Sequence, residues 1–460
     1  MKQGFSAIIA IMFVYQGAIA DEQLLHEAST AMELQDYAVA TRIYSDLVAQ
    51  QTLDAYLPLA DIYQQGYGQK SDTVKALHLV RSAAQLDYAP AQTRLGSYYE
   101  RGLGIKRNYQ QAMQWYQKAA SQNEPGAITR IGALYEAGHG VTQDYVRARE
   151  YYTQAAQSNY APAQYALGFL HEQGRGVTRN FDTARGWYLV AAHGNYPPAM
   201  NILAFMHRVG YGATIDYAQS VHWLRLSSGL GDAAGQDALG YMYEHGLGLT
   251  RNYVAAERWY RKAARQDFAE AQYHLGRLYS EGRGVEKNEK EALRWFLKSA
   301  AANHVEGMHQ AAVFYQQGRI AKQNYRKAIR LYRAAAEKGL AASQFAYARM
   351  LENGLGVKTN PAKALIWYRK AANQGHVGSQ TNLAYLLESG HGTKTDLAQA
   401  MVWYNIAART GDKTAIQRRD ILLRKLSDEQ AMRALNKARG WEENSLHLTL
   451  ERAQLLVQYP

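Results

Sequence analysis

The sequence has no cysteine among its 460 residues. Disulfides, thiolate metal sites and a lipid anchor attached to cysteine are therefore excluded, and stability must come from packing alone. Only 8 prolines occur, so helices have few internal breakers. Beyond a short run near the start, no apolar stretch approaches the roughly 18 residues that a membrane-spanning helix needs. We therefore expect no transmembrane segment.

Residues 1–20 read MKQGFSAIIAIMFVYQGAIA, with a positive end, a short apolar core and a small–any–small site. This order of features is typical of a secretory signal peptide. We predict cleavage before Asp21 and export of the remaining chain, which would be periplasmic or secreted and not a lipoprotein. A membrane anchor is the alternative, but the apolar core is short for a bilayer.

The formal net charge is +12 and the isoelectric point is about 9.4. Lys and Arg are spread along the whole chain rather than gathered in blocks. In an exported protein, this charge favours acidic glycans, anionic lipid headgroups or acidic proteins as partners over nucleic acid. A basic surface that serves only solubility is the alternative.

Glycine recurs at an unbroken interval of 36 residues, and in nine of ten copies a second glycine follows two residues later. The first glycines are Gly66, Gly102, Gly138, Gly174, Gly210, Gly246, Gly282, Gly318, Gly354 and Gly390. A period in this range is the mark of a repeat array.

Each repeat reads as helix A, a glycine-rich turn and helix B. The first glycine follows an apolar-periodic stretch and suits the left-handed residue that ends a helix. A few residues after the second glycine position comes an Asn or Asp, the residue types that cap a helix N-terminus. These are Asp72, Asn108, Asp144, Asn180, Asp216, Asn252, Asn288, Asn324, Asn360 and Asp396. A phosphate-binding loop would need a preceding strand, which the sequence does not offer.

Seven of the eight tryptophans occupy one equivalent position in helix B, and a small pair such as Ala119–Ala120 follows four residues later. A residue repeated in this way is expected to pack rather than to form seven separate binding sites. Helix A repeats a Leu–Gly or similar pair, as at Leu167–Gly168, which would let helix B cross closely.

The units LGSYYERGLGIKRNYQQAMQWYQKAA and LGRLYSEGRGVEKNEKEALRWFLKSA resemble the Sel-one-like repeat, or SLR, a relative of the tetratricopeptide repeat. The resemblance implies an all-α fold, a right-handed α-solenoid of helix-turn-helix repeats of 36 residues whose A helices line a concave face. We expect a signal peptide at 1–20, a degenerate repeat at 21–54, ten SLR repeats at 55–414 and C-terminal capping helices at 415–460. Ser427 is the expected N-cap of the closing helix.

The sequence carries no catalytic, cofactor or metal motif, so we predict that the protein is not an enzyme. His171 and His207 replace a helix A tyrosine in successive units. They could bind metal or sense pH, or simply fill half-buried sites. A glutamate two residues before the first glycine recurs in six units, and we expect it to be structural. Cysteine-rich SLR proteins have been linked to penicillin binding, and this sequence lacks those cysteines.

By analogy with tetratricopeptide repeats, the concave positions of helix A lie two and six residues after the small residue that opens each unit. We call these the +2 and +6 positions. The candidate partner-binding residues are Tyr165 and Tyr273 at +2, and Phe169, Phe205 and Tyr241 at +6 of successive units. Exposed rings in such a row would suit an extended peptide or a sugar chain. Packing of the rings between units is the alternative.

These features favour an exported scaffold that binds protein partners, because solenoids present variable surfaces on a rigid frame. The resemblance implies assembly scaffolds for polysaccharide export, or binders of a host protein of the immunoglobulin A type. Direct binding of cell-wall or acidic polysaccharide is the alternative function. No nucleic-acid partner is expected.

Overall fold

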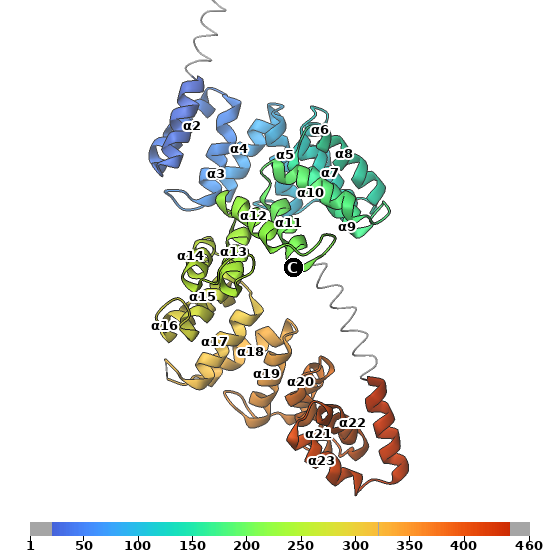
Figure 1. Cartoon of the computed structure of the whole chain (residues 1–460). Coiled ribbons are helices and arrows are strands. Elements are labelled where there is room, and N and C mark those ends of the chain that lie inside the picture. Colours follow the sequence, from blue (N-terminus) through green and yellow to red (C-terminus); the bar gives the residue numbers. More distant parts are fainter. Residues whose placement is uncertain (1–20, 321, 442–460) are drawn as a thin grey trace, which may run out of the picture. The chain divides into compact units, whose positions relative to one another are not determined.

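The computed structural model describes residues 21–320 and 322–441, and within these ranges the only regular secondary structure is helical. The expected signal peptide lies outside the described residues. The chain divides into two compact units, with the boundary between Ala199 and Met200 inside α11. Within each unit, consecutive helices pack in pairs, as the sequence predicted for an α-solenoid (Figure 1).

Ten repeats each supply one helix A and one helix B. The A helices are α3 (Tyr56–Gln65), α5 (Ala89–Arg101), α7 (Pro125–Ala137), α9 (Ala161–Gln173), α11 (Pro197–Val209), α13 (Ala233–His245), α15 (Ala269–Glu281), α17 (Val305–Gln317), α19 (Ala341–Asn353) and α21 (Val377–Ser389). The B helices are α4 (Thr73–Gln85), α6 (Tyr109–Ala120), α8 (Tyr145–Gln157), α10 (Phe181–His193), α12 (Tyr217–Gly229), α14 (Tyr253–Ala264), α16 (Glu289–Ala301), α18 (Tyr325–Glu337), α20 (Pro361–Asn373) and α22 (Leu397–Arg409). A short 3₁₀ turn, η1 (Leu53–Ala55), precedes α3.

Further helices lie on either side of the ten repeats. A helix over 21–33 and α2 (Tyr37–Ala49) precede them, and α23 (Lys413–Leu423) and a helix over 428–441 follow. The expected N-cap at Ser427 is confirmed, because its hydroxyl accepts a hydrogen bond from the Gln430 backbone N–H and the Gln430 side chain accepts one in return. Trp441 of the closing helix packs edge-on against Trp403, with ring centroids 5.7 Å apart. The last repeat is thereby covered.

The helix ends follow the sequence prediction in all ten repeats. Each predicted Asn or Asp accepts a hydrogen bond from a backbone N–H in the first turn of its helix B. Such a cap stabilises a helix by about 1 kcal/mol. Each first glycine has a positive φ, for example 72° at Gly102, a conformation that glycine adopts at little cost.

Helices A and B of one repeat touch where a ring lies on a small residue. A Cβ atom placed on Gly168 would lie 2.6 Å from the ring of Tyr188, which is 0% exposed. The same pairing joins Gly132 to Tyr152, at 2.7 Å. The predicted close crossing of the two helices is therefore confirmed.

The hydroxyl of this buried tyrosine donates a hydrogen bond to the recurrent glutamate of helix A, or to the glutamine in its place, over 2.6–2.9 Å. The pairs are Tyr116–Glu100, Tyr152–Glu136, Tyr188–Glu172, Tyr260–Glu244, Tyr332–Gln316, Tyr368–Glu352 and Tyr404–Glu388. A hydrogen bond to a charged group contributes about 1.5–3 kcal/mol. The glutamate is structural, as the sequence suggested.

Burial at the tryptophan position varies from repeat to repeat. Trp115, Trp187 and Trp259 are only half-buried, although several of their counterparts are buried. The ammonium of Lys262 lies 4.2 Å from the ring centre of Trp259, at the edge of solvent. The aromatic residue that fills the core is the next one along the helix, Tyr260, which is 0% exposed.

The close crossing predicts opposite effects for two glycines of one repeat. Gly168→Ala should lower the free energy of unfolding by about 1–3 kcal/mol, because the new methyl group overlaps the Tyr188 ring. Gly186→Ala should raise it by about 0.5–1 kcal/mol, since no atom lies within 4 Å of a Cβ at this helical position. Urea unfolding measures both. Equal stabilisation by the two changes would show that the close approach is not a constraint.

Candidate functional site

The +2 candidates pack against the residue that precedes the next helix A. The ring of Tyr165 lies 5.6 Å from that of Tyr196, and the ring of Tyr273 lies 5.0 Å from that of His304. Tyr165 also contacts the buried Tyr188, at 5.4 Å. Both candidates are half-buried. One side of each ring packs against the residue before the next helix A, and binding of a partner by these two residues stays a prediction.

Burial keeps these phenols neutral. It raises the pKa of Tyr165 to about 12, with smaller contributions from Tyr196 and Glu172. Burial also raises the pKa of Tyr273, and the nearby Arg277 opposes this shift. A neutral phenol with a raised pKa is a poor base at neutral pH. These two rings therefore offer surface and hydrogen bonds rather than acid–base chemistry.

The +6 positions are half-buried or exposed in every repeat. They are Asp61, Ser97, Ala133, Phe169, Phe205, Tyr241, Arg277, Val313, Arg349 and Tyr385. Since the neighbouring frame positions are fully buried, this register forms the variable surface of helix A. Phe169 belongs to the first compact unit, whereas Phe205 and Tyr241 both belong to the second.

An arginine side chain covers each of these three rings. The guanidinium carbon of Arg175 lies 5.2 Å from the ring centre of Phe169. That of Arg208 lies 5.5 Å from the centre of Phe205 and 5.3 Å from the centre of Tyr241, so one arginine serves two rings of adjacent repeats. Cation–π contacts of this kind contribute about 0.5–1 kcal/mol at exposed sites. The aromatic surface is therefore also positively charged.

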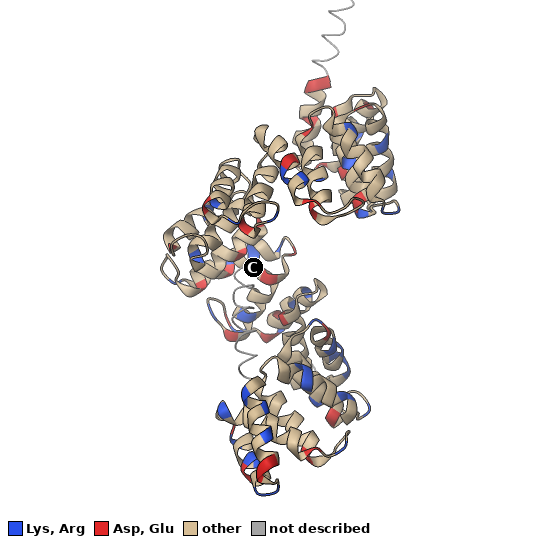
Figure 2. Cartoon of the chain, turned by 90° about the vertical axis from the view of Figure 1, so that its right-hand side faces the viewer, with Lys and Arg blue, Asp and Glu red and all other residues tan. Residues whose placement is uncertain are grey.

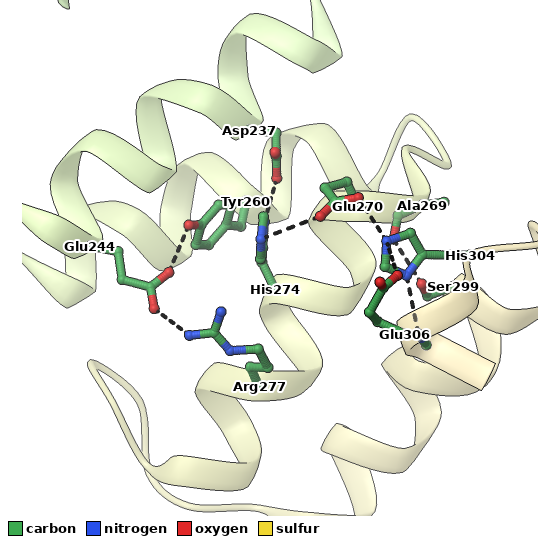
Figure 3. Close-up of polar contacts among 11 residues, drawn as sticks. Asp237, Glu244, Tyr260, Ala269, Glu270, His274, Arg277, Ser299, His304 and Glu306 are labelled. Atoms are coloured by element: carbon green, nitrogen blue, oxygen red, sulfur yellow. Dashed lines mark hydrogen bonds and ion pairs between the residues drawn. The ribbon is translucent and has the colours of Figure 1, made fainter. Parts of the chain in front are cut away.

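A group of acidic side chains and histidines in the second unit centres on the buried pair Asp237 and His274 (Figure 3). Asp237 and His274 are both 8% exposed, and the imidazole Nδ1 lies 2.9 Å from the carboxylate Oδ1. Nε2 of His274 lies 3.7 Å from Glu270, which also binds His304 at 2.7 Å. The group joins two successive repeats, 233–268 and 269–304. Sequence analysis missed it, because Asp237 and His274 fall at different positions of their repeats.

Mutual contacts fix the charge of this group. Burial alone would lower the pKa of His274, but its hydrogen bond and charge interaction with Asp237 outweigh burial and raise it. Burial raises the pKa of Asp237, and the hydrogen bond with His274 only partly opposes this shift. Both shifts mean that the pair keeps its shared proton to higher pH than either group would alone. The hydrogen bond from His304 lowers the pKa of Glu270.

In residues 21–320 and 322–441, no group of three His, Cys, Asp or Glu side chains is arranged to hold a metal ion. Across the same ranges, every helix is too short or too polar to cross a lipid bilayer. His171 and His207 are half-buried and belong to different compact units. Burial lowers the pKa of His171.

Comparison with known proteins identifies the repeat. The Sel1 repeat profile matches ten consecutive segments that run from residue 53 to residue 412. The chain belongs to the Sel1 repeat family. The matched segments begin at 53 rather than at 55, two residues before the boundary that the sequence suggested.

Two solved structures have the same architecture. The protein c5321 of uropathogenic Escherichia coli, described as a protective antigen with an SLR fold, is 30% identical with a TM-score of 0.62, and the match covers 97% of each chain. A Sel1 repeat protein from Oxalobacter formigenes is 24% identical with a TM-score of 0.51, over 67% of this chain and 90% of its own. No curated protein sequence matches the chain significantly.

The Asp237–His274 pair predicts a pH-dependent contribution to stability. Because the pKa of His274 is raised above its ordinary 6.5, the stabilisation is complete below pH 6.5 and is lost as pH rises through the folded-state pKa. His274→Gln keeps a hydrogen-bond donor beside Asp237 but removes the titrating charge. The difference in unfolding free energy between the wild type and this variant should shrink with increasing pH.

Urea unfolding at a series of pH values measures this difference. The variant His222→Gln removes an exposed histidine outside the group and reports the pH dependence of the remaining protein. A difference that stays constant across the series would show that the buried pair does not titrate.

Proposed function

We propose that the chain is an exported, non-enzymatic scaffold that binds a protein partner through the +6 surface of its A helices. Solenoids of the Sel1 and tetratricopeptide type typically mediate protein–protein interactions, and Sel1 repeat proteins are generally non-catalytic. The observation that carries the proposal is the contrast within helix A. Its frame positions repeat, whereas its +6 positions vary freely, stay accessible and carry three aromatic residues in successive repeats.

Accessible aromatic and arginine side chains are the residue types that dominate the energetics of protein interfaces. Phe205, Arg208 and Tyr241 supply both types on two adjacent repeats of the second unit. Phe169 with Arg175 supplies a second, smaller set in the first unit. We take these two sets as separate contact points for the partner.

Direct binding of an acidic polysaccharide is the second candidate. The net charge of +12 favours it, and Figure 2 shows basic and acidic residues interspersed along the helices. A mixed surface of this kind suits a protein partner better than a uniformly acidic polymer, whose binding would rely on a continuous positive field. Affinity for such a polymer would fall steeply as ionic strength rises.

Export is part of the proposal. Residues 1–20 have the features of a secretory signal peptide, and the similar Escherichia coli protein is described as a protective antigen. A role in an envelope or polysaccharide-export assembly, or in binding a host protein of the immunoglobulin A type, would follow from such a location. The partner would then meet the scaffold in the periplasm or outside the cell.

The export step predicts a defined N-terminus. In its native host, the mature protein should begin at Asp21, because cleavage follows the small–any–small site Ala18–Ile19–Ala20. Intact-mass measurement of the protein from the periplasmic and secreted fractions tests this. Recovery of the full chain with Met1 from the cytoplasm alone would refute export.

The binding surface predicts a separation of partner capture from stability. The double change Phe205→Ser and Tyr241→Ser should reduce cross-linked partner captured from the exported fraction by more than about tenfold, since interface aromatics often contribute 2 kcal/mol or more. The melting temperature should change little, because both rings are half-buried surface residues. Phe169→Ser tests the first unit alone.

The control is Tyr260→Phe, which removes the hydrogen bond to Glu244 inside the frame and leaves the +6 surface intact. This variant should melt at a lower temperature and capture the partner normally below that temperature. If the serine variants unfold instead, the rings are core residues and the proposed surface is wrong.

A further inference from the structure

Position 208 departs from the repeat frame. The equivalent residues of the neighbouring repeats are Glu172 and Glu244, each of which accepts a hydrogen bond from a buried tyrosine of helix B. In the repeat of residues 197–232 the tyrosine is replaced by Leu224, which is 2% exposed and has no hydroxyl. This repeat therefore lacks the tyrosine–glutamate hydrogen bond. Arginine in place of glutamate and leucine in place of tyrosine occur together in it.

In place of the tyrosine–glutamate hydrogen bond, this repeat has a cation in contact with two aromatic rings. The guanidinium of Arg208 lies against Phe205 of its own repeat and Tyr241 of the next. A guanidinium carries five N–H donors in a rigid plane, and within residues 21–320 and 322–441 those of Arg208 have no acceptor. Stacking against two rings fixes this plane while the donors at its edge stay available.

The surrounding chain has no free carboxylate to neutralise this charge. Residues 197–245 contain four acidic residues, namely Asp216, Asp232, Asp237 and Glu244. The first two cap helices, the third is paired with a buried imidazole, and the fourth accepts hydrogen bonds from a phenol and a guanidinium. Each of these carboxylates thus has a hydrogen-bond partner within the protein. None of these four carboxylates pairs with Arg208, so its half-exposed guanidinium is available to a carboxylate of another molecule.

We propose that Phe205, Arg208 and Tyr241 form a recognition site for a carboxylate of the protein partner, presented on an acidic peptide segment with neighbouring apolar side chains. The guanidinium would bind the carboxylate through two parallel hydrogen bonds, and the rings would pack against the apolar groups. This inference rests on the proposed function and specifies the partner chemistry at one of its contact points.

The test uses an array of short synthetic peptides that combine Asp or Glu with apolar residues, and a second array in which Asn and Gln replace the acids. Full-length protein should bind acidic peptides at least about tenfold more tightly than their amide counterparts, because charged hydrogen bonds are roughly twice as strong as neutral ones. Arg208→Gln should abolish this preference. Arg225→Gln removes an exposed charge of the same repeat and should retain it.

A second variant separates binding from folding. Arg208→Glu combined with Leu224→Tyr rebuilds the tyrosine–glutamate pair of the other repeats. The small residue opposite is Ala204, and alanine already faces a buried tyrosine at Tyr332 and Tyr368. This double variant should melt at or above the wild-type temperature and lose the preference for acidic peptides. Retention of the preference would overturn the inference.

The remaining outcomes distinguish the inference from the proposed function. Equal binding of acidic and amide peptides, lost with Phe205→Ser and Tyr241→Ser, would overturn carboxylate recognition and leave the scaffold function standing. Binding of polygalacturonate but of no peptide would replace the protein partner with a uronate polymer. Binding of neither probe would overturn both proposals for this surface.

Discussion

The contact between a buried tyrosine, a small residue and a glutamate is the constraint on which this structure depends. The small residue lets helix B approach until the ring lies on the backbone of helix A, as at Gly168 and Tyr188. The ring then carries its hydroxyl into the interior, where an unpaired polar group would cost about 1–3 kcal/mol. Glu172 satisfies it. The tyrosine of helix B thus depends on both the small residue and the glutamate of helix A.

In the repeats that carry Phe296 and Leu224, the tyrosine is replaced by a residue without a hydroxyl. In both of them the glutamate is replaced as well. Where phenylalanine replaces the tyrosine, at Phe296, helix A carries Ser280 and no glutamate is needed. Where leucine replaces it, at Leu224, helix A carries Arg208. Neither of these two repeats, which lack the hydroxyl, carries the glutamate, whereas Tyr332 keeps its hydroxyl and donates it to the neutral Gln316. The repeats therefore indicate that this position of helix A supplies an acceptor for the tyrosine hydroxyl, which is a glutamate in most repeats and a glutamine at Gln316.

The sequence predicted the helix pairs, their caps and their turns, because glycine and Asn or Asp perform local tasks that do not depend on tertiary contacts. It did not predict which of two adjacent aromatic residues fills the core. Trp259 and Tyr260 are one residue apart, about 100° around the helix, and composition favours the larger ring. Burial is decided by the approach of helix A. The buried Asp237–His274 pair was missed for the same reason, since it joins two different repeats.

The repeat of residues 197–232 combines its altered frame with unusual internal polarity. Side-chain atoms of Asn201, His207, Ser220 and Ser228 are buried and have no hydrogen-bond partner among the described residues. Alanine occupies the positions of Ser220 and Ser228 in most other repeats, so the serines are no requirement of the fold. Sequences that fold stably tend to satisfy local rules everywhere except at sites kept for another purpose. The same repeat lacks the tyrosine–glutamate hydrogen bond, contains these buried polar atoms and carries the half-exposed Arg208. A binding site that is maintained at the expense of stability would have this combination of features.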